Sequence, residues 1–197
     1  MMTWVWKDQS DDEDRFYADY DYDFSTLSGH LLRGPKPIAK DAGVAVLNAK
    51  RYSPARIRKY GCLPAASHER VIHQRLAPAL LASVGESEIQ LFPMTVLAKG
   101  GERLDEFLAV VPLNAIPCTD VEQSEITGWI APEFPGATAH KYNSLKHIDG
   151  CLGVLNIARD SITNLVVVSD KLKNSLEATH EPGLCFVRPE DMRSYIV

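Results

Sequence analysis

Residues 88–113 read EIQLFPMTVLAKGGERLDEFLAVVPL, and the predicted fold is built around them. Two apolar, β-prone runs, 88–97 and 105–113, flank a short polar segment that contains two glycines. Strand-forming runs separated in this way are typical of a β-hairpin. Pro93 and Pro112 have no backbone N–H to donate to a neighbouring strand, so each is expected at a sheet edge or at a bulge.

A short amphipathic helix is expected before this hairpin. Ser67 is a suitable N-cap, and Glu69 follows it in the first turn, where a carboxylate is favourable. Pro78 should end or kink the helix because its ring is incompatible with the helix interior. One buried stripe is expected from the apolar residues at helical spacing, which are Val71, Ile72, Leu76 and Leu80.

Further strands are expected on both sides of this region. The candidates are residues 4–6, 152–157, 164–168 and 184–187. Between the last two runs, Ser169 is suited to cap a helix whose inward residues are Leu172 and Leu176, and Gly183 resets the backbone after it.

The order of these elements favours an α+β fold, because strands stand before and after the helices without regular alternation. We predict a single domain with a mostly antiparallel sheet and a few flanking helices. A chain of 197 residues, 45% of them hydrophobic, can bury one substantial core. Residues 1–66 are interpreted as an acidic and Pro/Gly-rich region packed on the same domain, and residues 67–197 as its core.

Two features bear on the compartment. The chain has no apolar run of the roughly 18 residues that a membrane helix needs and no secretion signal at its start, so a cytoplasmic protein without membrane partners is expected. The four cysteines show no paired spacing typical of zinc or redox motifs, and they are interpreted as reduced core residues. They are Cys62, Cys118, Cys151 and Cys185.

Charge is distributed unevenly along the chain. The first 24 residues hold eight acidic and two basic side chains, whereas the remainder holds 18 acidic and 19 basic ones. An acidic segment of this kind disfavours direct nucleic-acid binding. Residues 50–59 are basic, so pairing between the two segments within one molecule is one explanation of both.

Two motifs resemble metal sites, but each lacks a feature that the metal site requires. His68 and His73 are five residues apart, which on a helix separates the imidazoles by roughly 140° and prevents them from sharing a zinc ion. Asp19, Asp21 and Asp23 alternate as a calcium loop begins, but the required glycine is replaced by Phe24. No phosphate-binding loop or nucleophile elbow is present, so no cofactor, metal site or catalytic residue is predicted.

Three blocks of the chain resemble a known family. They are the apolar run 88–94 ending in Pro93-Met94, the segment from Phe107 through Asp120 to Glu125, and the run 165–172 followed by Leu176 and residues 183–186. Together they are similar to immunity family eleven of bacterial polymorphic toxin systems, a myxobacterial-type immunity protein family. The resemblance covers roughly the last two-thirds of the chain, so residues 67–197 would be the immunity-family core.

The resemblance implies a role without transferring any functional residue, because all three blocks are structural. Members of such families neutralise a cognate toxin that is delivered between bacteria, often a nuclease, and they act in the cytoplasm. The implied partner is therefore a toxin domain, with a basic nuclease favoured. Whether the chain forms homo-oligomers stays open.

The acidic segment is our candidate for the toxin-binding surface. Acidic side chains would attract a basic nuclease over a distance, and tyrosines would supply buried contact area. The candidate residues are Asp11, Asp12, Glu13, Asp14, Tyr17, Asp19, Tyr20, Asp21, Tyr22 and Asp23.

Several alternatives stay open. One alternative is that the tyrosines pack on the protein's own sheet, and another is that the acidic residues form only a solubilising face. Blocking of the toxin's active site and binding at a remote surface are both compatible with the sequence. A different class of function is a hydrolase or modifying enzyme that uses His68 or His73, and a third is a general protein-interaction module.

Overall fold

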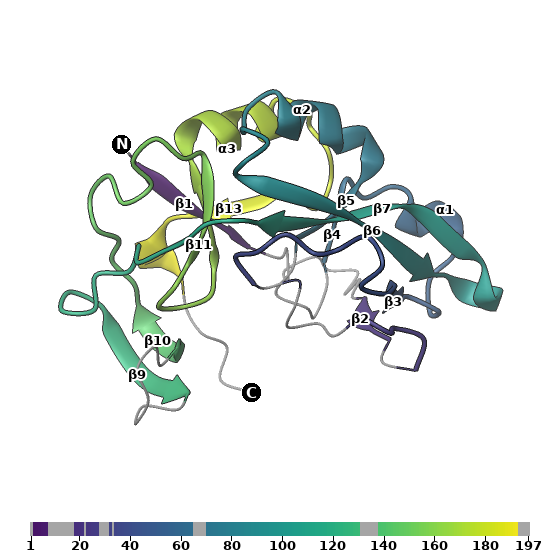
Figure 1. Ribbon diagram of the computed structural model, residues 1–197, viewed down its shortest axis with the longest axis horizontal. Coiled ribbons are helices and arrows are strands. Elements are labelled where there is room, and N and C mark those ends of the chain that lie inside the picture. The colour runs from purple at the N-terminus through teal and green to yellow at the C-terminus, as the bar shows by residue number, and fades with distance from the viewer. Residues whose placement is uncertain are drawn as a thin grey trace.

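The computed structural model describes residues 2–7, 18–21, 23–27, 32, 34–64, 70–130 and 138–192. Its strands form three sheets (Figure 1). In spatial order the largest sheet contains β2 (Asp19–Tyr20), β3 (Ala45–Asn48), β6 (Ile89–Leu97), β7 (Arg103–Pro112), β5 (Arg70–His73) and β4 (Cys62–Leu63). The second contains β13 (Cys185–Val187), β1 (Thr3–Lys7), β12 (Val166–Ser169), β11 (Ile157–Asp160) and β8 (Ala115–Ile116). The third pairs β9 (Glu125–Ile130) with β10 (Thr138–Ser144).

Helices are few and short in the described part of the chain. They are α1 (Pro54–Ile57), α2 (Ala77–Leu81) and α3 (Asp170–Glu177), together with the 3-10 turns η2 (Gln74–Leu76), η3 (Lys99–Gly101) and η4 (Pro189–Asp191). Of the strand pairs described, only β3 with β6 and β8 with β11 are parallel. The predicted α+β fold with mostly antiparallel sheets is confirmed.

The predicted hairpin is present as β6 and β7, and its turn contains Gly100 and Gly101 at positive φ. Strand β3 covers β6 only from Met94 onward, so Pro93 lies where β6 has no neighbour on that side. Likewise β5 reaches β7 only as far as Val110, before Pro112. Both prolines therefore occupy local edge positions, as the sequence predicts.

The helix expected from Ser67 to Pro78 is wrong in its first half. Residues 70–73 form strand β5, and Val71 and Ile72 face opposite sides of the sheet in two different apolar clusters. A strand that is buried on both faces carries consecutive apolar residues, which a helical stripe can mimic. Ser67 and Glu69 lie outside the described residues.

The C-terminal half of the expected helix also differs from the structure, where residues 74–81 form the 3-10 turn η2 and the short helix α2. Pro78 lies in the first turn of α2 rather than at its end, a position where a missing N–H costs nothing.

The strand expected over 152–157 begins only at Ile157, because Gly150 and Gly153 adopt positive φ in the turn before it. The capped helix is confirmed as α3, in which the Ser169 hydroxyl accepts the Leu172 N–H and Leu172 and Leu176 are buried.

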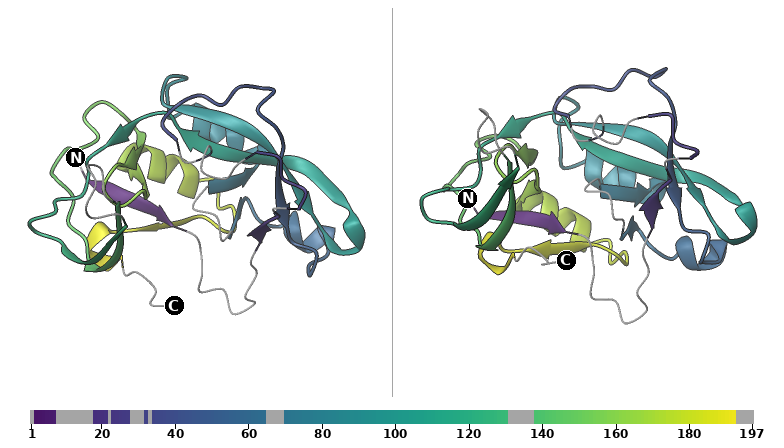
Figure 2. Two further views of the ribbon diagram at one scale, coloured as in Figure 1. Left: turned by 60° about the horizontal axis from the view of Figure 1, so that its bottom comes forward. Right: turned by 90° about the horizontal axis from the view of Figure 1, so that it is seen from below.

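The main core joins the two larger sheets. Trp6 of β1, Ile72 of β5 and Ile157 of β11 meet Leu172 and Leu176 of α3 in one apolar cluster. Helices α2 and α3 lie side by side over it (Figures 1 and 2), and the Ser175 hydroxyl donates to the Ala79 carbonyl at 3.3 Å. A second cluster lies on the opposite face of the six-stranded sheet.

Strands from residues 1–66 take part in both larger sheets: β1 pairs with β12 and β13, and β3 pairs with β6. The proposed division between residues 66 and 67 falls outside the described residues and stays a prediction. Within the described ranges, no helix is long and apolar enough to cross a membrane.

Candidate functional site

The described part of the acidic segment begins with β2, an edge strand of the six-stranded sheet (Figure 1). Asp19 pairs with Asn48 and Tyr20 with Leu47 of β3. The ladder continues as the Asp21 N–H donates to the Val46 carbonyl at 2.8 Å. Residues 19–21 are thus fixed to the sheet by backbone bonds.

Tyr20 and Asp21 are the buried members of the candidate surface. Tyr20 belongs to the apolar cluster under the sheet, and its hydroxyl donates to the Leu27 carbonyl. Only 6% of Asp21 is exposed, and its carboxylate lies 3.3 Å from the Lys50 ammonium and accepts the Asp23 N–H at 3.2 Å. Tyr20 therefore packs on the protein's own sheet, which was the alternative to toxin contact. Asp21 forms an ion pair with Lys50 of the basic segment.

Asp19, Asp23 and Phe24 face solvent, and we call them the edge patch. Phe24 is 56% exposed, and the Lys50 ammonium lies 4.8 Å from its ring centre. Aromatic side chains are enriched at protein interfaces, where such rings supply contact area. Asp11, Asp12, Glu13, Asp14, Tyr17 and Tyr22 lie outside the described residues.

The chain on both sides of residues 8–17 is anchored. On one side Lys7 of β1 pairs with Cys185 of β13 in the five-stranded sheet. On the other, the Ala18 N–H donates to the Pro64 carbonyl at 3.0 Å, immediately before β2 of the six-stranded sheet. The acidic residues of this stretch therefore lie, in sequence, between ends held by two different sheets.

An apolar groove lies on the six-stranded sheet. It has a volume of about 510 Å³ and runs beside β3 and the exposed half of β6. Val44, 51% exposed, and Pro93 contribute to its lining, and Lys40 and Asp105 supply its charges. The N–H of the same Val44 donates to the Thr26 hydroxyl, two residues after Phe24, so the groove and the edge patch are connected through this segment.

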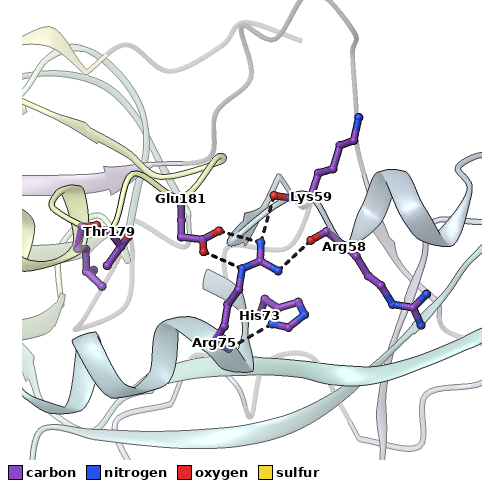
Figure 3. A network of polar contacts seen from close by, with 7 residues as sticks. Arg58, Lys59, His73, Arg75, Thr179 and Glu181 are labelled. Atoms are coloured by element: carbon purple, nitrogen blue, oxygen red, sulfur yellow. Dashed lines mark hydrogen bonds and ion pairs between the residues drawn. The ribbon is translucent and has the colours of Figure 1, made fainter.

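A second polar site, which we call the Arg75 network, joins distant parts of the chain (Figure 3). The Arg75 guanidinium donates to both carboxylate oxygens of Glu181, at 2.8 and 2.7 Å. It also donates to the carbonyls of Arg58 at 2.9 Å and Lys59 at 3.1 Å. One side chain thus fixes the segment after α1 to the segment after α3.

His73, one of the two histidines of the hydrolase alternative, serves this network structurally. Its Nδ1 accepts the Arg75 N–H at 3.2 Å and caps η2, and its ring meets Phe107 edge-on at 5.2 Å. Partial burial and the Arg75 charge lower the pKa of His73. No hydroxyl or thiol bonds to His73 in the described part of the chain, and His68 lies outside it.

Sequence reasoning did not identify Asp160, the most completely buried carboxylate described. Its oxygens accept four backbone N–H groups and two hydroxyls, so the buried charge is met by donors on all sides. The donors are the N–H groups of Cys118, Thr119, Ile162 and Thr163 and the hydroxyls of Thr119 and Thr163. Asp160 therefore holds the segment after β8 against the turn after β11.

The described residues contain no cluster of three or more side chains able to hold a metal ion. In comparisons with known proteins, no family model and no curated protein matches the chain.

Proposed function

We propose that this chain is a cytoplasmic immunity protein that binds a cognate interbacterial toxin and neutralises it by forming a stoichiometric complex. A basic nuclease is the favoured kind of toxin. One observation carries the proposal furthest: in sequence, the most acidic stretch of the chain lies between two ends that different sheets hold in place, and the exposed edge patch follows it.

This arrangement suits a binding surface for two physical reasons. Concentrated negative charge raises the rate at which a basic partner associates. Backbone pairing with β3 holds Asp19 of the edge patch in place, so this residue loses little conformational freedom when a partner binds.

Contacts within the chain change the set of residues that we assign to toxin binding. Tyr20 and Asp21 are engaged within the chain, so we assign them to anchoring β2 rather than to the toxin. Asp19 and Asp23 stay in the contact set, and Phe24 joins it. The remaining proposed contacts are Asp11, Asp12, Glu13, Asp14, Tyr17 and Tyr22.

Three of the five basic side chains of residues 50–59 have partners among the described residues. Lys50 pairs with Asp21, whereas Arg58 bonds to Glu106 at 2.6 Å and lies 3.4 Å from Glu102 on the β6–β7 hairpin. Arg56 stacks over Tyr52 at 5.0 Å. Among these described partners, Asp21 belongs to the acidic segment and the others do not.

The test is a titration of the toxin domain encoded by the neighbouring gene. Increasing amounts of this protein are added to a fixed amount of toxin, and both complex formation and toxin activity are followed. Stoichiometric binding predicts that activity falls linearly and ends at a fixed molar ratio, together with a complex of defined mass. Absence of any complex would contradict the proposal.

The same titration separates binding from the hydrolase alternative. His68→Ala and His73→Ala should both neutralise the toxin at the same ratio as the unchanged protein, because neither imidazole is assigned to the contact surface. Neutralisation by far less than one equivalent, lost in either variant while the complex persists, would instead indicate an enzyme that modifies its target.

A further inference from the structure

Cys118 and Cys151 form a close pair in the two segments that flank the β9–β10 hairpin in sequence. Their sulfur atoms are 2.7 Å apart, although the residues are separated by 33 positions. A disulfide needs about 2.05 Å, so a small movement of either side chain would join them. Cys118 is fully buried, whereas Cys151 is partly exposed.

Backbone hydrogen bonds fix both cysteines. The Cys118 N–H donates to the Asp160 carboxylate at 2.9 Å, and its carbonyl accepts the Ile148 N–H at 2.8 Å. The Ile148 carbonyl in turn accepts the Cys151 N–H at 3.1 Å. Because the paired positions are preset by the fold, the second thiol is at high effective concentration for the first.

The two thiols differ in reactivity. The hydrogen bond between the two sulfur atoms lowers the pKa of Cys151, favouring its thiolate. The same bond and burial raise the pKa of Cys118, so this thiol keeps its proton. The thiolate is the reactive form, and Cys151 is also the more accessible residue, so Cys151 is the attacking thiol and Cys118 the resolving one.

We propose that Cys118 and Cys151 form a reversible dithiol–disulfide site that low-molecular-weight disulfides, such as glutathione disulfide, oxidise. The Cys151 thiolate attacks one sulfur of glutathione disulfide, forming a mixed disulfide and releasing one glutathione thiolate. Cys118 then loses its proton and attacks the Cys151 sulfur, which releases the second glutathione. Two electrons pass from the cysteine pair to glutathione disulfide, and the two released glutathione thiolates take up protons from water, which balances the two protons that Cys151 and Cys118 lose.

The new bond would close a chain loop that contains the whole β9–β10 hairpin, which projects from the body of the molecule (Figure 1). The base of this loop is already joined by the bridge between Thr119 and His147. Oxidation should therefore slow amide hydrogen exchange in the hairpin and raise the melting temperature by about 5–10 °C. This site does not depend on the proposed toxin binding.

The test uses the full chain in mixtures of reduced and oxidised glutathione. Free thiols are trapped by alkylation, and disulfides are located by peptide mass spectrometry. We expect a linked Cys118–Cys151 peptide that reverts on addition of reduced glutathione. Cys118→Ser should stop at a glutathione adduct on Cys151, raising the amount of that adduct about tenfold over the unchanged protein. The matched control Cys185→Ser should still form the link.

The unchanged protein alone can overturn the proposal, so the result does not depend on how well the variants fold. If Cys118 and Cys151 stay open to alkylation after denaturation at every glutathione ratio, the pair is not a redox site. A persistent glutathione adduct on Cys151 of the unchanged protein, without closure, would contradict it as well.

Discussion

Gly183 shows how one residue can set the contact between two distant segments. Its φ is +90°, and a Cβ atom there would overlap the backbone carbonyl of Cys62. The Cys62 and Gly61 N–H groups both donate to the Pro182 carbonyl, at 3.2 and 2.9 Å, so neither segment can withdraw without losing bonds.

We expect Gly183→Ala to destabilise the fold by about 3 kcal/mol or more, because both its dihedral angle and its contact are unfavourable for alanine. Gly153→Ala is the matched control: its φ is +56°, but a Cβ would meet nothing within 4 Å. That variant should lose about 1 kcal/mol. Urea unfolding measures both values, and equal losses would contradict the assigned contact.

Arg75 acts at the same junction through its side chain. Replacing it with alanine removes the paired bonds to Glu181 and leaves the carbonyls of Arg58 and Lys59 without this donor. Because the side chain is 34% exposed, we expect a loss of only about 1–2 kcal/mol in unfolding free energy.

Arg51→Ala provides the comparison for this variant, since Arg51 is exposed. It removes the same charge, and its stability should stay within about 0.5 kcal/mol of the unchanged protein. Chemical denaturation of the two variants measures both unfolding free energies. Similar values for both would show that the Arg75 network contributes nothing.

At the scale of elements, His147 connects β1 to the base of the β9–β10 hairpin, where it forms a bridge with Thr119. The Thr3 hydroxyl bonds to His147 Nδ1 at 3.0 Å. Burial lowers the pKa of His147, with the charges of Asp160 and Glu190 acting in the opposite direction. The folded protein therefore takes up this proton less readily than the unfolded chain.

The free energy of unfolding therefore falls as the pH falls, because the unfolded chain binds the His147 proton more readily than the folded protein. The contribution of His147 to stability is fully present above its unfolded pKa of about 6.5 and is lost as the pH falls from there towards the lower folded value. His147→Gln should weaken the loss of stability between about pH 7.5 and pH 5.5, as followed by urea unfolding. The exposed His180 gives the control, and a slope altered equally by His180→Gln would refute the assignment.

The elements with strong local signals were the predictable ones. The β6–β7 hairpin follows from two apolar runs around a pair of glycines, and α3 follows from a serine cap and two inward leucines. Strand β5 was missed because Val71 and Ile72 are buried on opposite faces. Consecutive apolar residues then fit a helix and a doubly buried strand equally well.

The sites were harder to predict than the elements. No sequence motif marks Asp160, because two of its hydrogen-bond donors lie about 40 positions away in sequence. These donors are Cys118 and Thr119. Only the spacing to Thr163, typical of a side-chain-to-backbone turn, was a usable signal. In the acidic segment, Asp19 and Tyr20 alternate as exposed and buried residues of a strand, but we did not use this signal and placed Tyr20 in the candidate toxin-binding surface.

For the whole molecule, the proposal makes charge distribution more important than net charge. The formal net charge is −5, and the first 24 residues account for it, so the body of the protein is close to neutral. A basic toxin should therefore be attracted by the acidic segment more strongly than by the rest of the chain. We expect that neutralising acidic residues of this segment slows association, whereas removing equal charge elsewhere does not.

The most direct measurement is the association rate constant with the cognate toxin domain at low and high salt. It is compared for the unchanged protein, for Asp11→Asn/Asp12→Asn/Glu13→Gln/Asp14→Asn, and for a control with the same charge change at exposed positions, Glu86→Gln/Glu122→Gln/Glu125→Gln/Asp149→Asn. We predict that the first variant associates about tenfold more slowly at low salt and loses most of its salt dependence, while the control changes little. Equal rates for the two variants would contradict the account.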